Sequence, residues 1–349
     1  MIATKAYAAQ SATAPLGPWN IERREPGPHD VQIEISYCGV CHSDIHQVRD
    51  EWGGSIYPMV PGHEIVGRIT KVGDHVTRFK VGDLAGIGCF VDSCRVCDPC
   101  KAGEEQYCAE GNASTYNGYE MDRKTLTYGG YSTSIVVDEK YTLKVSDKLP
   151  LEGVAPLLCA GITTYSPLRH WKVGKGHKVA VLGLGGLGHM AVKLAASFGA
   201  EVTMLSTSPS KEADARKLGA HHFALITDKD VMKSLRSKFD FIINTISAPH
   251  EYNTYLKLLT INGVMIVLGI PPEPSQVPAF NLIMGRKSVA GSMIGGIRET
   301  QEMLDYCAEH NIASDVEVIN IEDINTAYER MMKGDVKYRF VIDIASLKK

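Results

Sequence analysis

Three glycines between an apolar strand pattern and a helix pattern constrain this chain more than any other feature. Gly183, Gly185 and Gly188 have the spacing G-x-G-x-x-G and directly follow the apolar run Lys178–Leu182. A helix pattern then covers residues 187–198. The first glycine permits a tight turn, the second lets a phosphate approach the backbone, and the third lets helix and strand pack closely. The motif predicts a doubly wound α/β domain that binds a dinucleotide at a helix N-terminus.

The patterns on either side of this turn divide the chain into three segments. Residues 1–155 read as short strands separated by glycines, with strands expected at 31–37, 60–72 and 131–137. Residues 156–295 alternate between strands and helices, which is typical of a parallel sheet; strands are expected at 178–182, 202–205, 239–243 and 264–268, and helices at 187–198, 211–218 and 252–259. Residues 296–349 read as helix 300–309, strand 316–319, helix 324–333 and strand 339–344. We expect a β-rich domain at 1–155 that segment 296–349 completes, and a dinucleotide-binding domain at 156–295.

Composition excludes several classes of function. The 349 residues carry a net charge of −3 without a basic run, which argues against a nucleic-acid partner. No apolar stretch reaches the roughly 20 residues of a membrane-spanning helix, and residues 1–10 lack the pattern of a signal peptide. The nine cysteines are an odd number, which argues against a disulfide framework. We expect a cytoplasmic protein with no nucleic-acid or membrane partner.

Four of the cysteines lie close together in a polar loop. Cys94, Cys97, Cys100 and Cys108 are spaced so that four thiolates can surround one tetrahedral zinc ion. Free thiols, or the ligands of an iron–sulfur cluster, are the alternatives. The sequence favours a structural zinc site, which is closed because all four positions are filled.

A second possible set of ligands is dispersed along the chain. Cys41, His63 and Cys159 would give zinc two thiolates and one imidazole, with one position left open for an alcohol. Spacing alone favours this set only weakly, because isolated cysteines and histidines are more often packing residues.

The turn expected after the second strand of the α/β domain bears on cofactor choice. Ser206, Thr207, Ser208 and Lys211 stand where an NAD-binding site would place an acidic residue for the ribose hydroxyls. Hydroxyl groups and a lysine suit the 2′-phosphate of NADP(H) instead. The same residues also form an ordinary helix N-terminus, with Ser208 as cap and Pro209 in the first turn.

Together these motifs resemble the zinc-dependent medium-chain alcohol dehydrogenases, in particular the branch of cinnamyl alcohol dehydrogenases and NADP-dependent aldehyde reductases. The resemblance rests on Gly62-His63-Glu64 followed by Gly67 and Gly73, on the cysteine loop, and on the segments 159–168 and 291–296. It extends from about residue 22 to 343. It implies a GroES-like β-rich domain holding two zinc ions, a Rossmann domain that binds NADP(H), and an active cleft between them.

The resemblance also implies roles for individual residues. Cys41, His63 and Cys159 would bind the catalytic zinc, Glu64 would lie behind it as an outer or exchanging ligand, and Asp44 would orient His63. Ser43 would donate to the alkoxide oxygen and begin a proton relay to His46. The cofactor would contact His42, Thr163, Gly183, Gly185, Gly186, Leu187, Gly188, Ser206, Thr207, Ser208, Lys211, Ser292, Ile294 and Arg339, and the substrate would contact Trp52, Tyr57, Phe90 and Ile294.

These features predict an enzyme that interconverts primary alcohols and aromatic, allylic or medium aliphatic aldehydes. A polyol or secondary-alcohol dehydrogenase is the alternative within the enzyme class, and a zinc- and cofactor-binding protein without turnover is the alternative outside it. Residues 286–292 read as the last strand of the Rossmann sheet, whose free edge would pair with a second copy. We therefore expect a homodimer.

Overall fold

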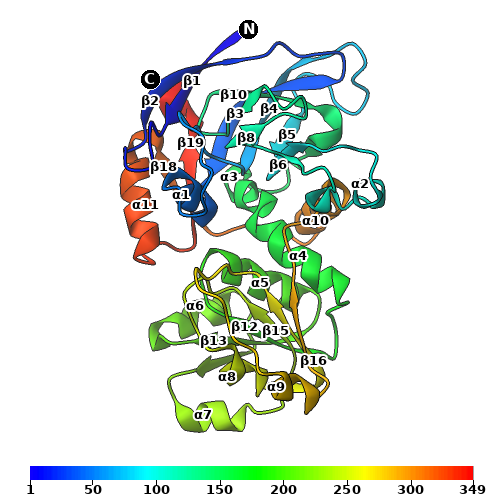
Figure 1. Ribbon diagram of the computed structural model, residues 1–349, viewed down its shortest axis with the longest axis vertical. Helices are drawn as coiled ribbons and strands as arrows, with labels where there is room; N and C mark the ends of the chain where they lie inside the picture. Colours follow the sequence, from blue (N-terminus) through cyan, green and yellow to red (C-terminus); the bar gives the residue numbers. More distant parts are fainter. Residues whose placement is uncertain (349) are drawn as a thin grey trace. The chain divides into compact units, whose positions relative to one another are not determined.

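The computed structural model describes residues 1–348, which form two compact units. Unit 1 consists of Met1–Ile162 with Gly295–Lys349, and unit 2 of Thr163–Ile294. The chain enters unit 2 within helix α4 (Ala160–His170), and Figure 1 labels the main elements of each unit.

Unit 2 is built on a six-stranded sheet in which each neighbouring pair is parallel. Its strand order is β14-β13-β12-β15-β16-β17, the doubly wound arrangement that places a ligand site where the order reverses. The strands are β12 (Lys178–Leu182), β13 (Glu201–Ser206), β14 (His222–Leu225), β15 (Phe239–Asn244), β16 (Leu259–Val267) and β17 (Ser288–Gly291). The other elements are α5 (Gly186–Ser197), η4 (Pro209–Lys211), α6 (Glu212–Lys217), α7 (Lys229–Ser234), α8 (Tyr252–Leu256) and α9 (Ala279–Ile283).

Most strands of unit 2 occur where the sequence predicts them, and β12 has the expected bounds. The helix expected at 252–259 is three residues too long, because α8 ends at Leu256 and β16 already begins at Leu259. Leu258 and Leu259 are both buried, and either a helix or a strand could bury them, so their pattern does not distinguish the two. Strand β14 and helix α7 were not expected.

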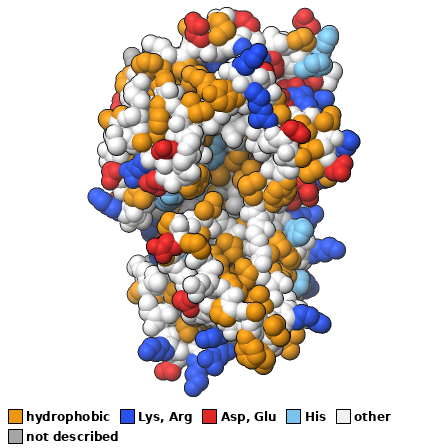
Figure 2. Space-filling view, viewed as in Figure 1, with side chains coloured by type: hydrophobic (Ala, Val, Ile, Leu, Met, Phe, Trp, Pro, Cys, Tyr) orange, Lys and Arg blue, Asp and Glu red, His pale blue; other side chains and the backbone are white. Residues whose placement is uncertain are grey.

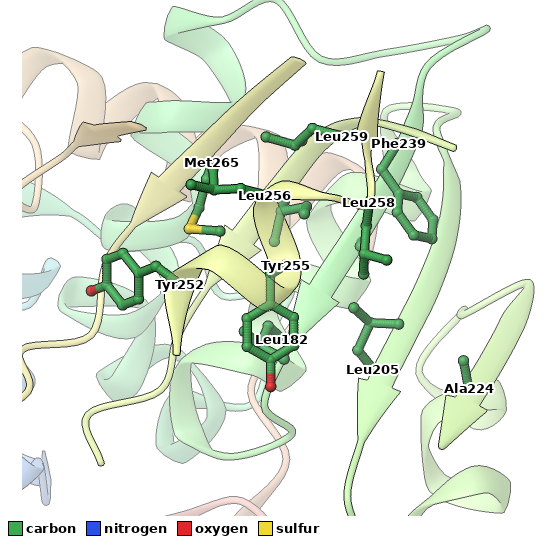
Figure 3. Packing of buried hydrophobic residues seen from close by; sticks show 12 residues of the cluster. Leu182, Leu205, Ala224, Phe239, Tyr252, Tyr255, Leu256, Leu258, Leu259 and Met265 are labelled. Carbon is green, nitrogen blue, oxygen red and sulfur yellow. The ribbon is translucent and has the colours of Figure 1, made fainter. Parts of the chain in front are cut away.

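A buried apolar cluster joins the sheet of unit 2 to helix α8. Leu182, Leu205, Phe239 and Met265 come from four different strands and pack with Tyr255 of the helix (Figure 3). Each fully buried side chain of this size contributes roughly 1.5–3 kcal/mol. The apolar run Val179–Leu182 of β12 is continuous and fully buried, as is typical of a parallel strand covered on both faces.

Unit 1 contains a seven-stranded mixed sheet of order β11-β5-β4-β3-β19-β18, with β10 also paired to β3. Its strands are β3 (Asp30–Gly39), β4 (Ile65–Val72), β5 (Leu84–Ile87), β10 (Ser134–Asp138), β11 (Leu143–Lys144), β18 (Val316–Asn320) and β19 (Arg339–Asp343). Smaller antiparallel pairs are β1 (Ile2–Ala8) with β2 (Gly17–Arg23), β6 (Phe90–Asp92) with β7 (Ala113–Ser114), and β8 (Gly118–Tyr119) with β9 (Leu126–Thr127).

The last segment of the chain completes this sheet, since β19 pairs with β3 in the register Asp343↔Tyr37. The helices of unit 1, besides α4, are α1 (His42–Val48), α2 (Asp98–Ala102), α3 (Leu151–Val154), α10 (Ile297–Glu309) and α11 (Ile324–Met332). Short 3₁₀ turns lie at η1 (Glu105–Tyr107), η2 (Glu139–Tyr141), η3 (Ala155–Leu158), η5 (Ile321–Asp323) and η6 (Ile344–Lys348). The strand expected at 60–72 begins only at Ile65, because Pro61 and Gly62 lie in a loop whose backbone bonds to side chains and to residues 129–131. None of the helices in residues 1–348 has the length and apolar character needed to span a membrane.

Candidate active site and metal sites

A buried group of four potential metal ligands lies in unit 1. One ligand atom from each of Cys41, His63, Glu64 and Cys159 falls within 4.8 Å of all the others, and the two sulfur atoms are 3.9 Å apart. Cys41 is the N-cap of α1, His63 and Glu64 lie in the loop before β4, and Cys159 follows η3. The fold thus brings together residues separated by 118 positions in the chain.

Asp44 hydrogen-bonds two residues of this ligand group. Its side chain is fully buried, and Oδ1 accepts hydrogen bonds from Nδ1 of His63 and the backbone N–H of Gly62, both at 3.1 Å. Oδ2 accepts from the backbone N–H of Cys41 at 2.9 Å. With Nδ1 bound to a carboxylate, Nε2 of His63 is the nitrogen left to bind a metal.

Glu64 is occupied by a buried ion pair. Its carboxylate binds the guanidinium of Arg339 from β19, and both side chains are almost inaccessible to solvent. Gly39 makes room for it, since a Cβ at that position would lie 1.9 Å from Oε2 of Glu64. Oε2 of Glu64 and Nε of Arg339 are buried without a hydrogen-bond partner in the described chain. One polar atom of each partner is therefore buried beside the ligand group without a hydrogen bond.

The electrostatics of the group favour thiolate at Cys41. A hydrogen bond with the Cys159 thiol lowers the pKa of Cys41, and the positive charges of Arg339 and His63 add to the effect against burial. The same thiol contact raises the pKa of Cys159. Burial alone would lower the pKa of Arg339, but Glu64 and the two thiols outweigh it and keep the guanidinium charged.

Helix α1 and the turn after it carry the residues predicted to handle protons and substrate. Oγ of Ser43 lies 3.7 Å from the sulfur of Cys41. Nδ1 of His46 hydrogen-bonds the carboxylate of Glu51, and Trp52 stacks on the His46 ring at 4.9 Å between centroids. His42 is exposed one turn away from His46.

Two of the predicted substrate contacts have other neighbours in unit 1. The hydroxyl of Tyr57 donates to the carbonyl of Val48 at 2.7 Å. Phe90 is 3% exposed and packs edge-on against Tyr141. Their predicted contact with substrate stays a prediction.

The second ligand group is formed by Cys94, Cys97, Cys100 and Cys108, whose sulfur atoms all lie within 4.8 Å of one another. Backbone N–H groups point at these sulfurs, from Cys94 to Cys108, from Cys97 to Cys94, and from Ala109 to Cys97. Bonds from the backbone N–H groups of Ala109 and Cys100 lower the pKa of Cys97 to about 6. The four thiols have the donor chemistry and closed arrangement of a structural zinc site.

The glycine turn of unit 2 has the geometry that each glycine predicts. Gly183 has φ +93°, which favours glycine, and a Cβ at Gly188 would lie 1.8 Å from the carbonyl oxygen of Gly183. A Cβ at Gly185 would meet no atom within 4 Å, so the backbone there faces open space. Gly186 and Leu187 begin α5, and the first N–H groups of a helix have no partner within it.

The predicted phosphate residues lie next to this turn. Nζ of Lys211 donates to the carbonyl of Leu184 at 3.1 Å, which links η4 to the glycine turn. Oγ of Ser206 accepts from the backbone N–H of Ser208, and Oγ of Ser208 lies 2.8 Å from Oγ of Ser210. Thr207 is exposed beside them.

The remaining predicted cofactor residues are dispersed. Thr163 is buried in α4, and Ser292 follows the edge strand β17. Ile294 has φ +37°, a costly conformation for a β-branched residue. Arg339 lies with Glu64, as described above, and its predicted contact with the cofactor stays a prediction.

Sequence reasoning missed several neighbours of these groups. Glu51 and the Glu64–Arg339 pair gave no local signal, because nothing in the spacing indicates a hydrogen bond to His46 or an ion pair across 275 residues. Tyr116, whose ring stacks on that of His63, was also missed. The run Thr115-Tyr116-Asn117 is a polar turn with one aromatic residue and carries no known motif.

Two family profiles match the chain, an alcohol dehydrogenase GroES-like domain over residues 27–147 and a zinc-binding dehydrogenase over residues 186–309. The chain is 56% identical to NADP-dependent alcohol dehydrogenase C 1 of Mycolicibacterium smegmatis over the full length of both. It is 55% identical to the aldehyde reductase YahK of Escherichia coli, covering 98% of this chain and 99% of that one. Among solved structures it is similar to a cinnamyl alcohol dehydrogenase of Sorghum bicolor, with a TM-score of 0.95, 45% identity, and coverage of 99% and 98%.

These likenesses confirm the predicted combination of a GroES-like β-rich domain with a Rossmann domain. The sequence motifs, the fold and the full-length similarity all indicate the same family. The chain belongs to the zinc-dependent medium-chain alcohol dehydrogenases, in the branch that includes cinnamyl alcohol dehydrogenases and NADP-dependent aldehyde reductases.

Proposed function

We propose that this protein reduces aldehydes to primary alcohols, and oxidises those alcohols in reverse, by hydride exchange with NADP(H) at a zinc centre formed by Cys41, His63 and Cys159. The observation that carries the proposal is the buried ligand group with His63 held by Asp44. Relatives named as an NADP-dependent alcohol dehydrogenase and an aldehyde reductase support the reaction.

The residues present fit a zinc ion with an open position. Two thiols and an imidazole nitrogen are good zinc ligands. The ion pair with Arg339 engages Oε1 of Glu64, so Glu64 would serve as an outer or exchanging ligand. A zinc ion held by these three side chains would supply Lewis acidity, which lowers the pKa of an alcohol and polarises an aldehyde.

The chain's own residues would then orient the substrate and move its proton. The Ser43 hydroxyl, beside Cys41, would hydrogen-bond the substrate oxygen. His46, on the next turn of α1 and bound to Glu51, would pass the proton to solvent. The stacked Trp52 would contribute apolar surface for the substrate.

We further propose a second, structural zinc ion at Cys94, Cys97, Cys100 and Cys108, which makes two ions per chain. The supporting observation is the clustering of four sulfurs with backbone N–H groups directed at three of them. Nine free thiols also suit the reducing cytoplasm, where we place the protein.

NADP(H) would bind on unit 2 with its pyrophosphate at the glycine turn. The 2′-phosphate would bind at Ser206, Thr207, Ser208 and Lys211. No carboxylate stands among these residues in the sequence, and Lys211 lies next to the glycine turn. The hydride itself belongs to the chemistry of the cofactor.

We also propose that two copies associate through the free edge of β17. This strand ends the order of the unit 2 sheet, and nearby α9 exposes Phe280 and Ile283, 67% and 73% accessible, with Met284 beside them. Figure 2 shows hydrophobic side chains gathered where α9 lies in Figure 1. An exposed strand edge next to apolar surface is typical of a dimer interface.

A comparison of substrates tests the proposed reaction. Purified protein with NADPH is offered aromatic, allylic and aliphatic aldehydes and simple ketones, and with NADP⁺ it is offered primary alcohols, secondary alcohols and polyols. We expect kcat/KM to be highest for aldehydes and primary alcohols. Preferential oxidation of polyols or secondary alcohols would instead support the alternative dehydrogenase function, and no turnover with any of them would contradict an enzymatic role.

A further inference from the structure

A tyrosine that no motif indicates lies against the proposed catalytic ligands. The ring of Tyr116 stacks on the ring of His63, with centroids 5.8 Å apart and planes inclined by 23°. The tyrosine is buried, with 6% of its surface exposed, and so is His63. Tyr116 therefore covers one face of the imidazole and leaves it less room to rotate about its bond to Cβ.

Tyr116 also lies close to the carboxylate that binds His63. Burial raises the pKa of Tyr116 well above its ordinary value, and the negative charge of Asp44 adds to the rise. Asp44 in turn accepts from Nδ1 of His63. Tyr116 therefore packs over the face of the histidine and lies near the carboxylate that holds it.

The segment that carries Tyr116 is fixed on both sides. The backbone N–H and the hydroxyl of Thr115 donate to the carbonyls of Cys89 and Gly88, which lie between β5 and β6. The side chain of Asn117 accepts from the backbone N–H of Ile56 and donates to Gln47 of α1. Because α1 also carries Cys41 and Asp44, the position of Tyr116 is set relative to the ligands themselves.

Two other tyrosines near Asp44 lack this relationship. Tyr131 and Tyr328 are buried, and each has its pKa raised, first by burial and then by the charge of Asp44. Their hydroxyls lie 3.4 Å from each other. Tyr328 thus provides a matched control with the same buried environment and the same nearby carboxylate.

We propose that Tyr116 is a positioning residue of the Cys41/His63/Cys159 centre, whose ring sets the orientation of His63. The inference rests on the proposed metal-binding role of these three residues. Partners of metal-binding histidines commonly change metal affinity by about 10- to 100-fold when removed. An imidazole free to rotate would hold the ion less tightly and in a less uniform geometry.

Metal release from the intact protein tests this directly. Zinc-loaded wild type, Tyr116→Phe, Tyr116→Leu and Tyr328→Leu are titrated with a colorimetric zinc chelator, and the cobalt-exchanged proteins are compared by visible absorption. Cys159→Ala identifies which release step belongs to the catalytic group. We expect Tyr116→Leu, which removes the ring, to weaken binding in that step by about tenfold and to alter the cobalt bands, whereas Tyr116→Phe, which keeps the ring, should stay close to the wild type. Tyr328→Leu should leave the affinity and the bands unchanged, even where both Leu variants lose similar thermal stability.

The outcomes separate the two proposals. Wild-type affinity and an unchanged cobalt spectrum in Tyr116→Leu would overturn the positioning role while leaving the metal site intact. An effect of Tyr328→Leu equal to that of Tyr116→Leu would overturn it as well, because a general loss of packing would then explain both. A wild type whose metal release does not respond to Cys159→Ala would overturn the metal site and, with it, the role of Tyr116.

Discussion

Nζ of Lys211 lies 3.1 Å from the carbonyl oxygen of Leu184, in the middle of the glycine turn. The contact joins the glycine turn to the hydroxyl-rich turn after β13. It places the ammonium of Lys211 beside the helix N-terminus that begins at Gly186. A dinucleotide bound at the glycine turn would lie near Lys211 and near Ser206 and Ser208.

Cofactor preference follows from this arrangement. Wild type should have a much higher kcat/KM with NADPH than with NADH, because the 2′-phosphate adds roughly two negative charges that require donors and a cation. The double variant Ser206→Asp with Lys211→Ala should shift the ratio toward NADH by about 2–4 kcal/mol, the size of one or two charge-assisted hydrogen bonds. Initial rates with both cofactors measure the shift.

A matched control for cofactor preference is Arg216→Ala. Arg216 is a nearby cation, but its guanidinium is bound to Glu212 within α6 and to the carbonyl of His221. Removing it should leave the ratio of kcat/KM with NADPH to kcat/KM with NADH unchanged. Equal kcat/KM with the two cofactors in the wild type would contradict the assignment. A larger effect of Arg216→Ala than of the double variant would indicate that the 2′-phosphate binds at α6 instead.

Metal content is predicted for each ligand group separately. Elemental analysis should find two zinc ions per chain in the wild type and one in Cys97→Ser. The Cys97 variant should also melt at a lower temperature, because a structural zinc site contributes folding free energy directly. One zinc per chain in the wild type, or iron at the four cysteines, would contradict the two-zinc proposal.

Removal of only one partner of the Glu64–Arg339 ion pair should destabilise the protein. Arg339→Met leaves the Glu64 carboxylate buried without its counter-charge, and we expect a loss of about 3–5 kcal/mol in the free energy of unfolding. The double variant Glu64→Gln with Arg339→Met should lose less than the sum of the single variants. Denaturant titration of the four proteins measures the coupling, and strict additivity would show that the two groups do not stabilise each other.

Association through unit 2 predicts a dimer in solution. Light scattering should give twice the chain mass for the wild type, and Ile283→Glu should shift the protein toward monomer by placing a charge in the apolar surface of α9. Val81→Glu changes an apolar residue of unit 1 with 58% exposure and should leave the dimer intact. A monomeric wild type at micromolar concentration would contradict the proposed interface.

The sequence predicted well those elements whose local pattern agrees with their environment in the folded protein. The strand expected at 178–182 has those bounds as β12, since its apolar run is bounded by a charged residue and a glycine. Helix α8 was predicted too long because Leu258 and Leu259 satisfy a helical period and a strand equally. The strand β14 has only four residues, too few for a period to be seen.

The candidate site divides in a similar way. Clustered cysteines and the spaced glycines are local patterns, so chemistry alone indicated their roles. Glu64 with Arg339, and Tyr116 with His63, are contacts between distant segments, and only the packing of β19 on β3 and of the β7–β8 connection on α1 brings them together. Such neighbours have no signature in a single sequence, because each residue alone is an ordinary buried polar or aromatic side chain.

The ligand group at Cys159 is expected to perform the NADPH-linked reduction of aldehydes. The direct measurement is the initial rate of NADPH consumption with an aromatic aldehyde, for wild type, Cys159→Ala and Cys307→Ala. Cys307 is a fully buried cysteine of α10 outside both ligand groups and serves as the matched control. We predict that wild type and Cys307→Ala turn over, and that Cys159→Ala falls to the background rate with an unchanged circular dichroism spectrum and one zinc ion fewer. Retained activity in a folded Cys159→Ala variant, or no NADPH consumption by the wild type, would contradict the account.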